Sequence, residues 1–416
     1  MKILQINATY RTGSTGEIIS GIAQVSADAG FDTYYVCASL SEDQRNDHIL
    51  VMGNRLDHKI HALRSRILGR QGGGSLLATL KLLKWIDEIC PDIIHLHNLH
   101  SNYIHVPLLF RYIQRRGIKT VITLHDCWFF TGKCCHFLYD GCNLWKSGCG
   151  NCPRRRKDIP SYFFDRSAED FKEKRKLIGR VDVKELLTTG EYPYVHVVGC
   201  SQWITACARE SLLAERVEKT ICNGIDLNIF KPYQTDVYEE LHKHDAFIIL
   251  GMANKWLSED GRETYDHVVK KLGPRMKLFL IGCTPKQIAE NSNAHVFMSG
   301  FIKNRIELAK CFSSADVFVN VTKADSFPTV NIESIACGTP VITYDSGGSA
   351  EIVDWQTGEV VPYGNYEQLL QSITRIQEIG KKYYSEKCRQ RAESLYNKKQ
   401  TFLEYVELYS QISTNK

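Results

Sequence analysis

The sequence has no long apolar run and no segment of low complexity. Nowhere in its 416 residues does it approach the roughly 18 consecutive apolar residues of a membrane-spanning helix. The first residues, MKILQINATY, also lack the apolar core and the small-residue cleavage site of a secretory signal. These absences lead us to expect a globular protein of the cytoplasm.

An excess of one charge is also missing. The formal net charge is +5, which is too small to indicate by itself a nucleic acid or a membrane as partner. Fifteen cysteines are present, but the count is odd and no export signal accompanies them, so reduced thiols are expected rather than a disulfide framework. The chain is longer than one hydrophobic core usually supports, which favours two domains.

Short apolar segments alternate with longer amphipathic ones along the whole chain. Nearly continuous apolar segments of this length are typical of parallel strands that are covered on both faces. The pattern therefore predicts an α/β fold, built twice. The segments are KILQIN, TYYVCAS, DIIHLHN, KTVITLH and VHVVGCS in the first half, and AFIILGMA, KLFLIGC, VFVNVT and PVITYD in the second.

Turn residues separate the two series of strands. The stretch TICNGIDLNIFKPY, residues 220–233, ends the first series, and a new strand pattern begins at Ala246. We therefore expect a first domain over residues 1–225 and a second over residues 233–395.

The end of the chain, residues 396–416, has the apolar spacing of one more helix. Its face should pack on a neighbouring surface, and we expect the first domain to provide it. The apolar positions are Phe402, Val406, Tyr409 and Ile412.

Two carboxylates lie eight positions apart in ADSFPTVNIESIACGTP, residues 324–340. Asp325 falls in a loop, and Glu333 falls in the first turns of a short helix that Gly338 ends. The N–H groups at a helix start can bind a phosphate or a sugar hydroxyl, and carboxylates accept hydrogen bonds from polyols. The alternative is that Glu333 only compensates the helix dipole and Asp325 is solvated. The N–H groups concerned are those around Phe327, Pro328, Thr329 and Val330.

This region is one of several motifs with a distinctive order. An acid, any residue, Phe and Pro precede the second acid, and ACGTPVI and GGSAEIV follow. Elsewhere stand CSQWITACARESLL, ICNGIDLNIFKP and ELAKCFSSADVFVNVTKADSF. In order and spacing these motifs resemble the retaining glycosyltransferases of family 4, of the capsular and exopolysaccharide type, over nearly the whole chain.

The resemblance implies the GT-B fold, with two Rossmann-like domains that face a central cleft. The C-terminal domain would hold the nucleotide sugar and the N-terminal domain the acceptor. Glu333 would bind the ribose hydroxyls and Asp325 the donor hexose, with Glu351 of GGSAEIV in a loop beside the donor. For Glu351 alone, a helix N-terminal acid is an equally good interpretation.

Two positions depart from the family pattern. The first acid is usually Glu, and here it is the shorter Asp325. The loop after the first strand of the second domain usually carries an Arg and a Lys for the diphosphate, with the Lys before a Gly, but Asp260 precedes Gly261. Lys255 and Arg262 are the substitutes nearby, because a departing diphosphate needs positive charge.

The N-terminal domain contributes further candidates. The loop NATYRTGSTGEII follows the first strand, its glycines allow close approach to a ligand, and the run from Ser14 to Glu17 predicts a capping box. In the family this loop faces the donor phosphates and the acceptor. Its candidate donor-binding residues are Gly13, Ser14 and Gly16.

Histidines follow two strands of the first domain. His125 and Asp126 lie just past a strand end, where open α/β sheets bind ligands. The resemblance implies that His125 is a catalytic residue near the donor hexose and Asp126 an acceptor-side residue. His97 of HLHN is a further acceptor-side candidate, although a single His is more often structural.

Six cysteines crowd into residues 127–152 and end in a CxxC pair. This pair has the spacing of a zinc knuckle, and two more thiolates would complete a tetrahedral structural site. Free buried thiols and an iron–sulfur cluster stay open as alternatives. The zinc ligands that we expect are Cys134, Cys142, Cys149 and Cys152.

A basic amphipathic helix is predicted in RLDHKIHALRSRILGR, and RRRK at residues 154–157 adds positive charge. Such a helix can lie on an anionic membrane surface, although a solvated face is equally compatible with it. Its apolar residues are Ile60, Leu63, Ile67 and Leu68.

Together these features predict a retaining transferase that moves a hexose or N-acetylhexosamine from a nucleotide sugar to a glycan acceptor. UDP is favoured over GDP, a lipid-linked acceptor is common in the family, and transfer needs no cofactor. Two alternatives stay open: a GT-B sugar-nucleotide epimerase, and a zinc-bearing nucleic-acid-binding protein. An NAD-linked enzyme is disfavoured because no G-x-G-x-x-G follows a strand.

Overall fold

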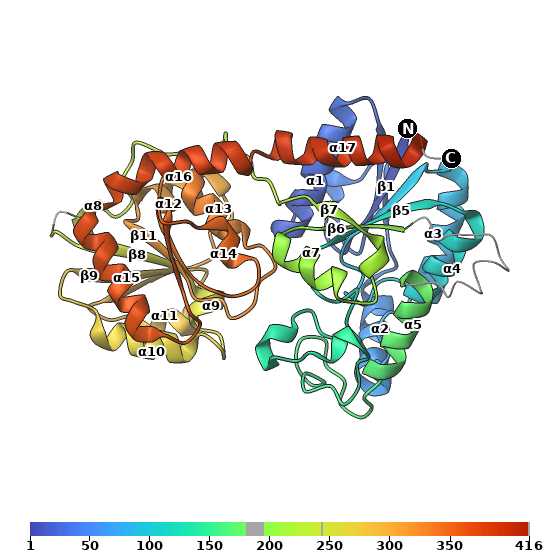
Figure 1. The fold of residues 1–416 in the computed structure, drawn as a ribbon, viewed down its shortest axis with the longest axis horizontal. Helices are drawn as coiled ribbons and strands as arrows, with labels where there is room; N and C mark the ends of the chain where they lie inside the picture. Colours follow the sequence, from blue (N-terminus) through green and yellow to red (C-terminus); the bar gives the residue numbers. More distant parts are fainter. Residues whose placement is uncertain (180–194, 243, 415–416) are drawn as a thin grey trace. The chain divides into compact units, whose positions relative to one another are not determined.

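The computed structural model describes residues 1–179, 195–242 and 244–414 (Figure 1). The chain divides into two compact units. The N-terminal unit comprises Met1–Cys222 and Thr401–Lys416, and the C-terminal unit comprises Asn223–Gln400. The division after Cys222 falls within the turn-rich stretch at residues 220–233.

The N-terminal unit is built on a parallel sheet with the strand order β3-β2-β1-β4-β5-β6-β7. Its central strands are apolar and buried because helices cover both faces. The strands are β1 (Lys2–Ile6), β2 (Asp32–Cys37), β3 (Ile49–Val51), β4 (Ile93–Leu96), β5 (Lys119–Leu124), β6 (Val195–Gly199) and β7 (Val217–Thr220).

Helices of this unit follow the strands in the expected alternation. They are α1 (Gly13–Asp28), α2 (Arg55–Leu68), α3 (Leu76–Ile89), α4 (Val106–Arg116), α5 (Ser167–Ile178), α7 (Gln202–Arg209) and the C-terminal α17 (Lys398–Thr414). Between β5 and α5 a long loop holds two short 3-10 turns, Phe137–Asp140 and Leu144–Lys146.

The C-terminal unit repeats the architecture with the strand order β10-β9-β8-β11-β12-β13, again all parallel. Its strands are β8 (Phe247–Met252), β9 (Met276–Ile281), β10 (Val296–Ser299), β11 (Val317–Asn320), β12 (Val341–Tyr344) and β13 (Gly358–Val361). Its helices are α8 (Glu239–His242), α9 (Ala253–Trp256), α10 (Arg262–Lys271), α11 (Pro285–Asn291), α12 (Arg305–Ser314), α13 (Thr329–Ala336), α14 (Ser349–Ile352), α15 (Tyr366–Ile379) and α16 (Lys381–Leu395). Both units are therefore Rossmann-like, as the sequence predicts.

Helix α17 returns to the N-terminal unit and becomes part of its core (Figure 1). Phe402 packs so closely on α1 that a side chain at Gly21 would meet its ring at 2.5 Å. The hydroxyl of Tyr409 lies 2.6 Å from Nδ1 of the buried His95. The predicted packing of the C-terminal helix on the first domain is confirmed.

None of the helices in the described ranges is both long and apolar enough to cross a membrane.

Candidate active site

Each sheet reverses its strand order at one point. The reversal lies between β1 and β4 in the N-terminal unit and between β8 and β11 in the C-terminal unit. Open parallel sheets bind ligands outside the carboxyl ends of their strands at such a point. The segments that follow these strands are therefore where a site should lie, and most of the predicted residues stand there.

Asp325 and Lys255 meet at the reversal point of the C-terminal unit. Lys255 follows β8 and Asp325 follows β11, and Lys255 Nζ lies 3.4 Å from Asp325 Oδ2. Lys255 also donates to Thr322 Oγ1 at 3.2 Å. Both charged side chains keep about a quarter of their surface exposed, 28% and 27%, so a ligand can reach the pair.

Arg262 is placed differently. It opens α10, and its guanidinium donates to Asn291 Oδ1 at 2.9 Å and pairs with Asp266 at 3.2 Å. Of the two cations that the sequence offers for a diphosphate, the structure brings Lys255 against Asp325.

Helix α13 presents one accessible face beside this pair. Its buried face carries apolar and small residues, whereas Thr329, Val330 and Glu333 are half-buried. These three lie on one side of the helix because residues three and four apart are neighbours. Pro328 is the N-cap, so the N–H groups of the first turn lie at the end of the helix that directly follows the Asp325 loop.

The loop after β12 holds the backbone of Asp325 in place. Gly347 has φ +60°, and a Cβ there would stand 2.1 Å from the carbonyl oxygen of Asp325. Gly348 N donates to that same oxygen at 3.0 Å. Phe327 N donates to Asp325 Oδ1 at 3.2 Å. Glu351 belongs to α14, which begins directly after this glycine pair.

The predicted glycine loop begins α1 in the N-terminal unit. Gly13 is the first helical residue and has φ +69°, and Ser14 is exposed. Gly16 is buried, where a Cβ would approach Arg11 N at 3.2 Å. The capping box predicted from Ser14 to Glu17 is wrong, because Thr12 is the N-cap and makes no side-chain cap hydrogen bond.

A chain of hydrogen bonds fixes the tautomer of His125. Gln5 Nε2 donates to Ile19 O at 3.4 Å, so Gln5 Oε1 accepts from His97 Nε2–H at 3.2 Å. His97 Nδ1 then accepts from His125 Nε2–H at 3.0 Å. On this assignment His125 Nδ1 carries the lone pair. His97 is completely buried, so any contribution to a site passes through the partly exposed His125.

The fully buried His97 and the half-buried His125 make the stability of the protein depend on pH. Burial lowers the pKa of His125 to about 4 and holds the pKa of His97 well below its usual value. In the unfolded chain a histidine has a pKa of about 6.5. Between about pH 4 and that value the unfolded state therefore binds more protons than the folded state. The free energy of unfolding should therefore fall as the pH falls from about 6.5 toward about 4.

Urea unfolding at about pH 7 and about pH 5 measures this loss. In His125→Gln the amide can still donate to His97 but cannot be protonated, so the pH dependence should be weaker. An equal pH dependence in both proteins would contradict the assignment.

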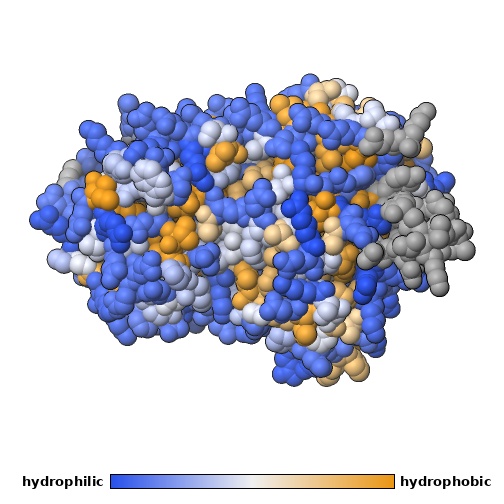
Figure 2. Space-filling model, viewed as in Figure 1, coloured by the Kyte–Doolittle hydropathy of each residue, from blue (hydrophilic) through white to orange (hydrophobic). Residues whose placement is uncertain are grey.

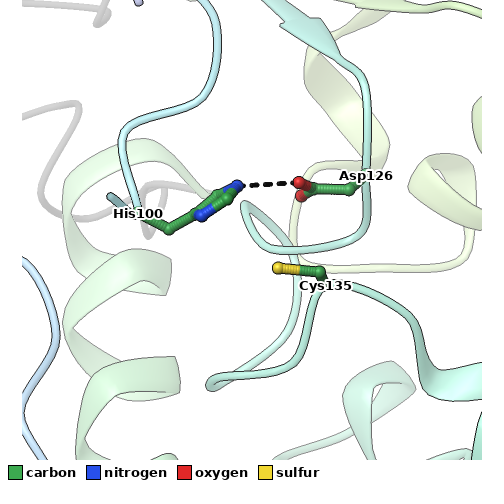
Figure 3. Close-up of side chains that lie close together, drawn as sticks. All are labelled: His100, Asp126 and Cys135. Carbon is green, nitrogen blue, oxygen red and sulfur yellow. Dashed lines mark hydrogen bonds and ion pairs between the residues drawn. The ribbon is translucent and has the colours of Figure 1, made fainter. Parts of the chain in front are cut away.

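Asp126 lies directly after β5 and meets His100 and Cys135 (Figure 3). Asp126 Oδ2 is 2.9 Å from His100 Nε2, and Trp128 N donates to Oδ1 at 2.8 Å. Burial alone would raise the pKa of Asp126, but His100, His136 and the Trp128 N–H together lower it to about 2. Asp126 is therefore ionised at neutral pH.

Within the described ranges, the four predicted zinc ligands do not lie as close together as His100, Asp126 and Cys135 do. Among the described residues, the group of three or more metal-ligand side chains with atoms within 4.8 Å of one another is His100, Asp126 and Cys135. That group contains Cys135 and not its neighbour Cys134. Burial raises the pKa of Cys134 to about 12. The set Cys134, Cys142, Cys149 and Cys152 stays a prediction.

The basic cluster RRRK is partly used inside the protein. Arg154 pairs with Asp158 at 2.7 Å and with Asp140 at 3.1 Å, and its guanidinium lies over the ring of Tyr139. Only 11% of its side chain is exposed. Arg154 therefore stabilises the loop between β5 and α5 and adds little to the charge of the protein surface.

Two family models match this sequence. The model described as Glycosyltransferase Family 4 matches residues 19–228, just over half of the chain. The chain belongs to glycosyltransferase family 4. A second model, Glycosyl transferases group 1, matches residues 262–408 of this family-4 glycosyltransferase. The predicted resemblance and fold class are confirmed.

Similar proteins agree with this assignment. The family-4 glycosyltransferase is 27% identical to the colanic acid biosynthesis glycosyl transferase WcaC of Escherichia coli, over 99% of this chain and 100% of the relative. A GDP-mannose-dependent alpha-mannosyltransferase of Mycobacterium tuberculosis is 26% identical over 39% of this chain and 43% of its own.

Two solved structures have the same fold at low identity. Sucrose-phosphate synthase of Thermosynechococcus elongatus has a TM-score of 0.71 at 18% identity, with both chains covered completely. Anabaena HepE, solved with UDP, has a TM-score of 0.69 at 15% identity, covering 99% of this chain and 100% of its own.

The sequence alone does not reveal several polar residues that the structure places at or near these strand ends. Gln5, Thr322 and His100 are single polar residues without a motif, and their partners lie far away in the sequence. Gly347 carries a weak signal, since it stands in a Gly pair after a strand. The predicted strand pattern is enough to place all four residues near the ends of strands. It does not reveal which residues they contact.

Proposed function

We propose that this glycosyltransferase moves a hexose or N-acetylhexosamine, with retention of configuration, from a nucleotide sugar to a glycan acceptor in polysaccharide biosynthesis. The observation that carries the proposal is the Lys255–Asp325 pair beside the accessible face of α13. A cation, a carboxylate and helix N–H groups are the groups that a sugar diphosphate needs.

Each group has a part in donor binding. Glu333 accepts hydrogen bonds from the ribose hydroxyls, and Asp325 accepts them from the hexose. Lys255 and the first N–H groups of α13 face the diphosphate, whose negative charge grows as it leaves. Charge-assisted hydrogen bonds of this kind contribute about 1.5 to 3 kcal/mol each.

The reaction needs no nucleophile from the protein. The bond between the anomeric carbon and the diphosphate oxygen breaks, and the acceptor oxygen bonds to that carbon on the same face. The acceptor proton passes to the departing diphosphate. The protein then contributes orientation and electrostatic stabilisation. In the N-terminal unit, His125 Nδ1 is available to accept a hydrogen bond from a sugar hydroxyl.

We propose UDP as the nucleotide and a lipid-linked saccharide as the acceptor. Support for UDP comes from Anabaena HepE, which was solved with UDP and with UDP-glucose. The mycobacterial relative depends on GDP-mannose, so the choice needs a direct test.

Release of nucleoside diphosphate tests the function. The protein is incubated with UDP-glucose, UDP-N-acetylglucosamine or GDP-mannose, with and without lipid-linked saccharides. UDP should appear only when both substrates are present, and the anomeric proton of the product should show the donor's configuration by NMR. Conversion of the donor sugar without an acceptor would instead indicate an epimerase.

The predicted membrane contact has support in the burial of α2. This helix buries His61 and Ser65, while the apolar side chains predicted on its face are exposed, by 39% to 56%. Arg64 and Arg66 are exposed among them. Figure 2 shows hydrophobic and hydrophilic residues mixed in the region of the N-terminal unit where Figure 1 labels α2. We propose that this face lies on an anionic lipid surface.

Vesicle sedimentation tests this contact. The wild type should bind vesicles that contain phosphatidylglycerol, and Leu63→Glu should weaken binding at least about tenfold, since burial of one Leu is worth about 1.5 to 3 kcal/mol. Ile379→Glu, at an exposed position on α15, is the matched control and should bind like the wild type. Equal binding of both variants would contradict the proposal.

A further inference from the structure

Three side chains from separate parts of the N-terminal unit converge on one point (Figure 3). His100 comes from the loop after β4, Asp126 follows β5, and Cys135 comes from the long loop between β5 and α5. One ligand atom of each lies within 4.8 Å of the other two. The resemblance implies an acceptor-side role for Asp126 alone, and it does not account for the meeting of all three side chains.

The geometry points to a structural zinc site formed by His100, Asp126 and Cys135. Zinc binds Cys sulfur at about 2.3 Å and His nitrogen or carboxylate oxygen at about 2.0 to 2.2 Å. Atoms bound to one ion therefore stand closer together than 4.8 Å, and small side-chain movements would close the gap. The thiolate disfavours magnesium and calcium, which take oxygen ligands.

The charges of the three groups suit a buried divalent ion. Bound zinc with one thiolate, one carboxylate and one neutral imidazole is a neutral assembly, which avoids the cost of burying net charge. On binding, Cys135 releases its thiol proton to solvent and forms the sulfur–metal bond. The proton of His100 that Nε2 donates to Asp126 moves to Nδ1 through solvent, which frees Nε2 for the metal, and the hydrogen bond between the two residues is replaced by their two bonds to the ion.

The surroundings hold the ligands in position. Trp128 N donates to Asp126 Oδ1 at 2.8 Å, which leaves Oδ2 toward the cluster. Cys127 N donates to the carbonyl of Cys135 at 2.7 Å and fixes that residue beside the end of β5. Such contacts orient ligands in known metal sites. The positive charge of His136 acts on Asp126, which makes His136 a candidate for a fourth ligand.

The role that follows is mechanical. Residues 127–152 form a long loop with little regular structure, and a long loop costs entropy to order. An ion bound by Cys135 and Asp126 would tie this loop to the strand end that carries His125. We therefore expect removal of the metal to loosen the loop first, with faster proteolysis there.

Metal analysis of the purified full-length protein tests the site. After dialysis against a chelator and return of zinc alone, the wild type should hold one equivalent by elemental analysis. His100→Ala and Cys135→Ser should lose it. Cys134→Ser and Cys149→Ser are matched controls, since both belong to the alternative four-cysteine set, and both should keep it.

Three results would overturn the inference: no zinc in the wild type, zinc retained in Cys135→Ser, or zinc lost from Cys134→Ser and Cys149→Ser. If a variant fails to fold, replacing zinc by cobalt in the wild type tests the site instead. Its sulfur-to-metal charge-transfer absorption grows with the number of thiolates, so one thiolate predicts a weak band and four a strong one. A strong band would favour the four-cysteine site. None of these readouts depends on transferase activity.

Discussion

Lys255→Met should lower kcat by about 10²- to 10³-fold, the usual cost of removing one group that stabilises charge in a transition state. Lys255 Nζ lies 3.4 Å from Asp325 Oδ2 in the segment after β8, where the family pattern usually has a Lys before a Gly but Asp260 precedes Gly261 in this chain. Negative charge grows on the diphosphate as the sugar departs, so the loss should appear in kcat more than in the KM for the donor.

The variant itself should fold normally. Asp325 keeps 27% of its side chain exposed, so water can solvate the carboxylate when its partner is removed. Lys323→Met is the matched control: this lysine is two residues from Asp325 but pairs with Asp260 at 3.5 Å. Lys323→Met should keep nearly full activity, and Lys255→Arg should recover part of the loss. Equal activities of the two methionine variants would show that Lys255 does not meet the diphosphate.

Gly347→Ala should lower activity by about 10²-fold, because displacement of a reacting or binding group by about 1 Å has effects of this size. The added Cβ would stand 2.1 Å from the carbonyl oxygen of Asp325, so one of the two backbones must move. Gly347 also has φ +60°, which costs an alanine about 1 to 2 kcal/mol.

The control separates displacement from backbone strain. Gly364 has φ +77°, and a Cβ there meets nothing within 4 Å. Gly364→Ala should therefore lose some thermal stability and keep its activity. If Gly347→Ala transfers sugar as fast as Gly364→Ala, the position of Asp325 is not critical and its assignment to the donor hexose fails.

The sequence predicts the central strands of both sheets better than the edge strands. Every apolar segment singled out from the sequence is a strand, because buried parallel strands are continuous apolar runs. The edge strands β3, β7, β10 and β13 were not predicted. They span three or four residues each and carry little periodic signal, and their pairing with a neighbour decides their structure.

Contacts between residues that lie far apart in the sequence are the second feature that the sequence does not predict. Spacing shows that Cys134 and Cys135 are adjacent, but the backbone decides which thiol turns toward Asp126. Similarly, the conformation of the segment after β8 decides that Lys255, and not Arg262, lies beside Asp325. The motif around Asp325 and Glu333 was informative because both residues lie on one short segment, where local helix geometry suffices.

Thermal unfolding with nucleotide sugars tests the donor site most directly. A ligand at about 100 times its Kd adds about 2.7 kcal/mol of stability, which raises Tm measurably. We expect UDP-glucose or UDP-N-acetylglucosamine to raise the Tm of the wild type and of Glu378→Ala, a control at an exposed acid on α15, but not of Glu333→Ala. If no nucleotide sugar shifts the wild type, or if Glu333→Ala shifts equally, the edge of the sheet beside α13 does not bind the donor.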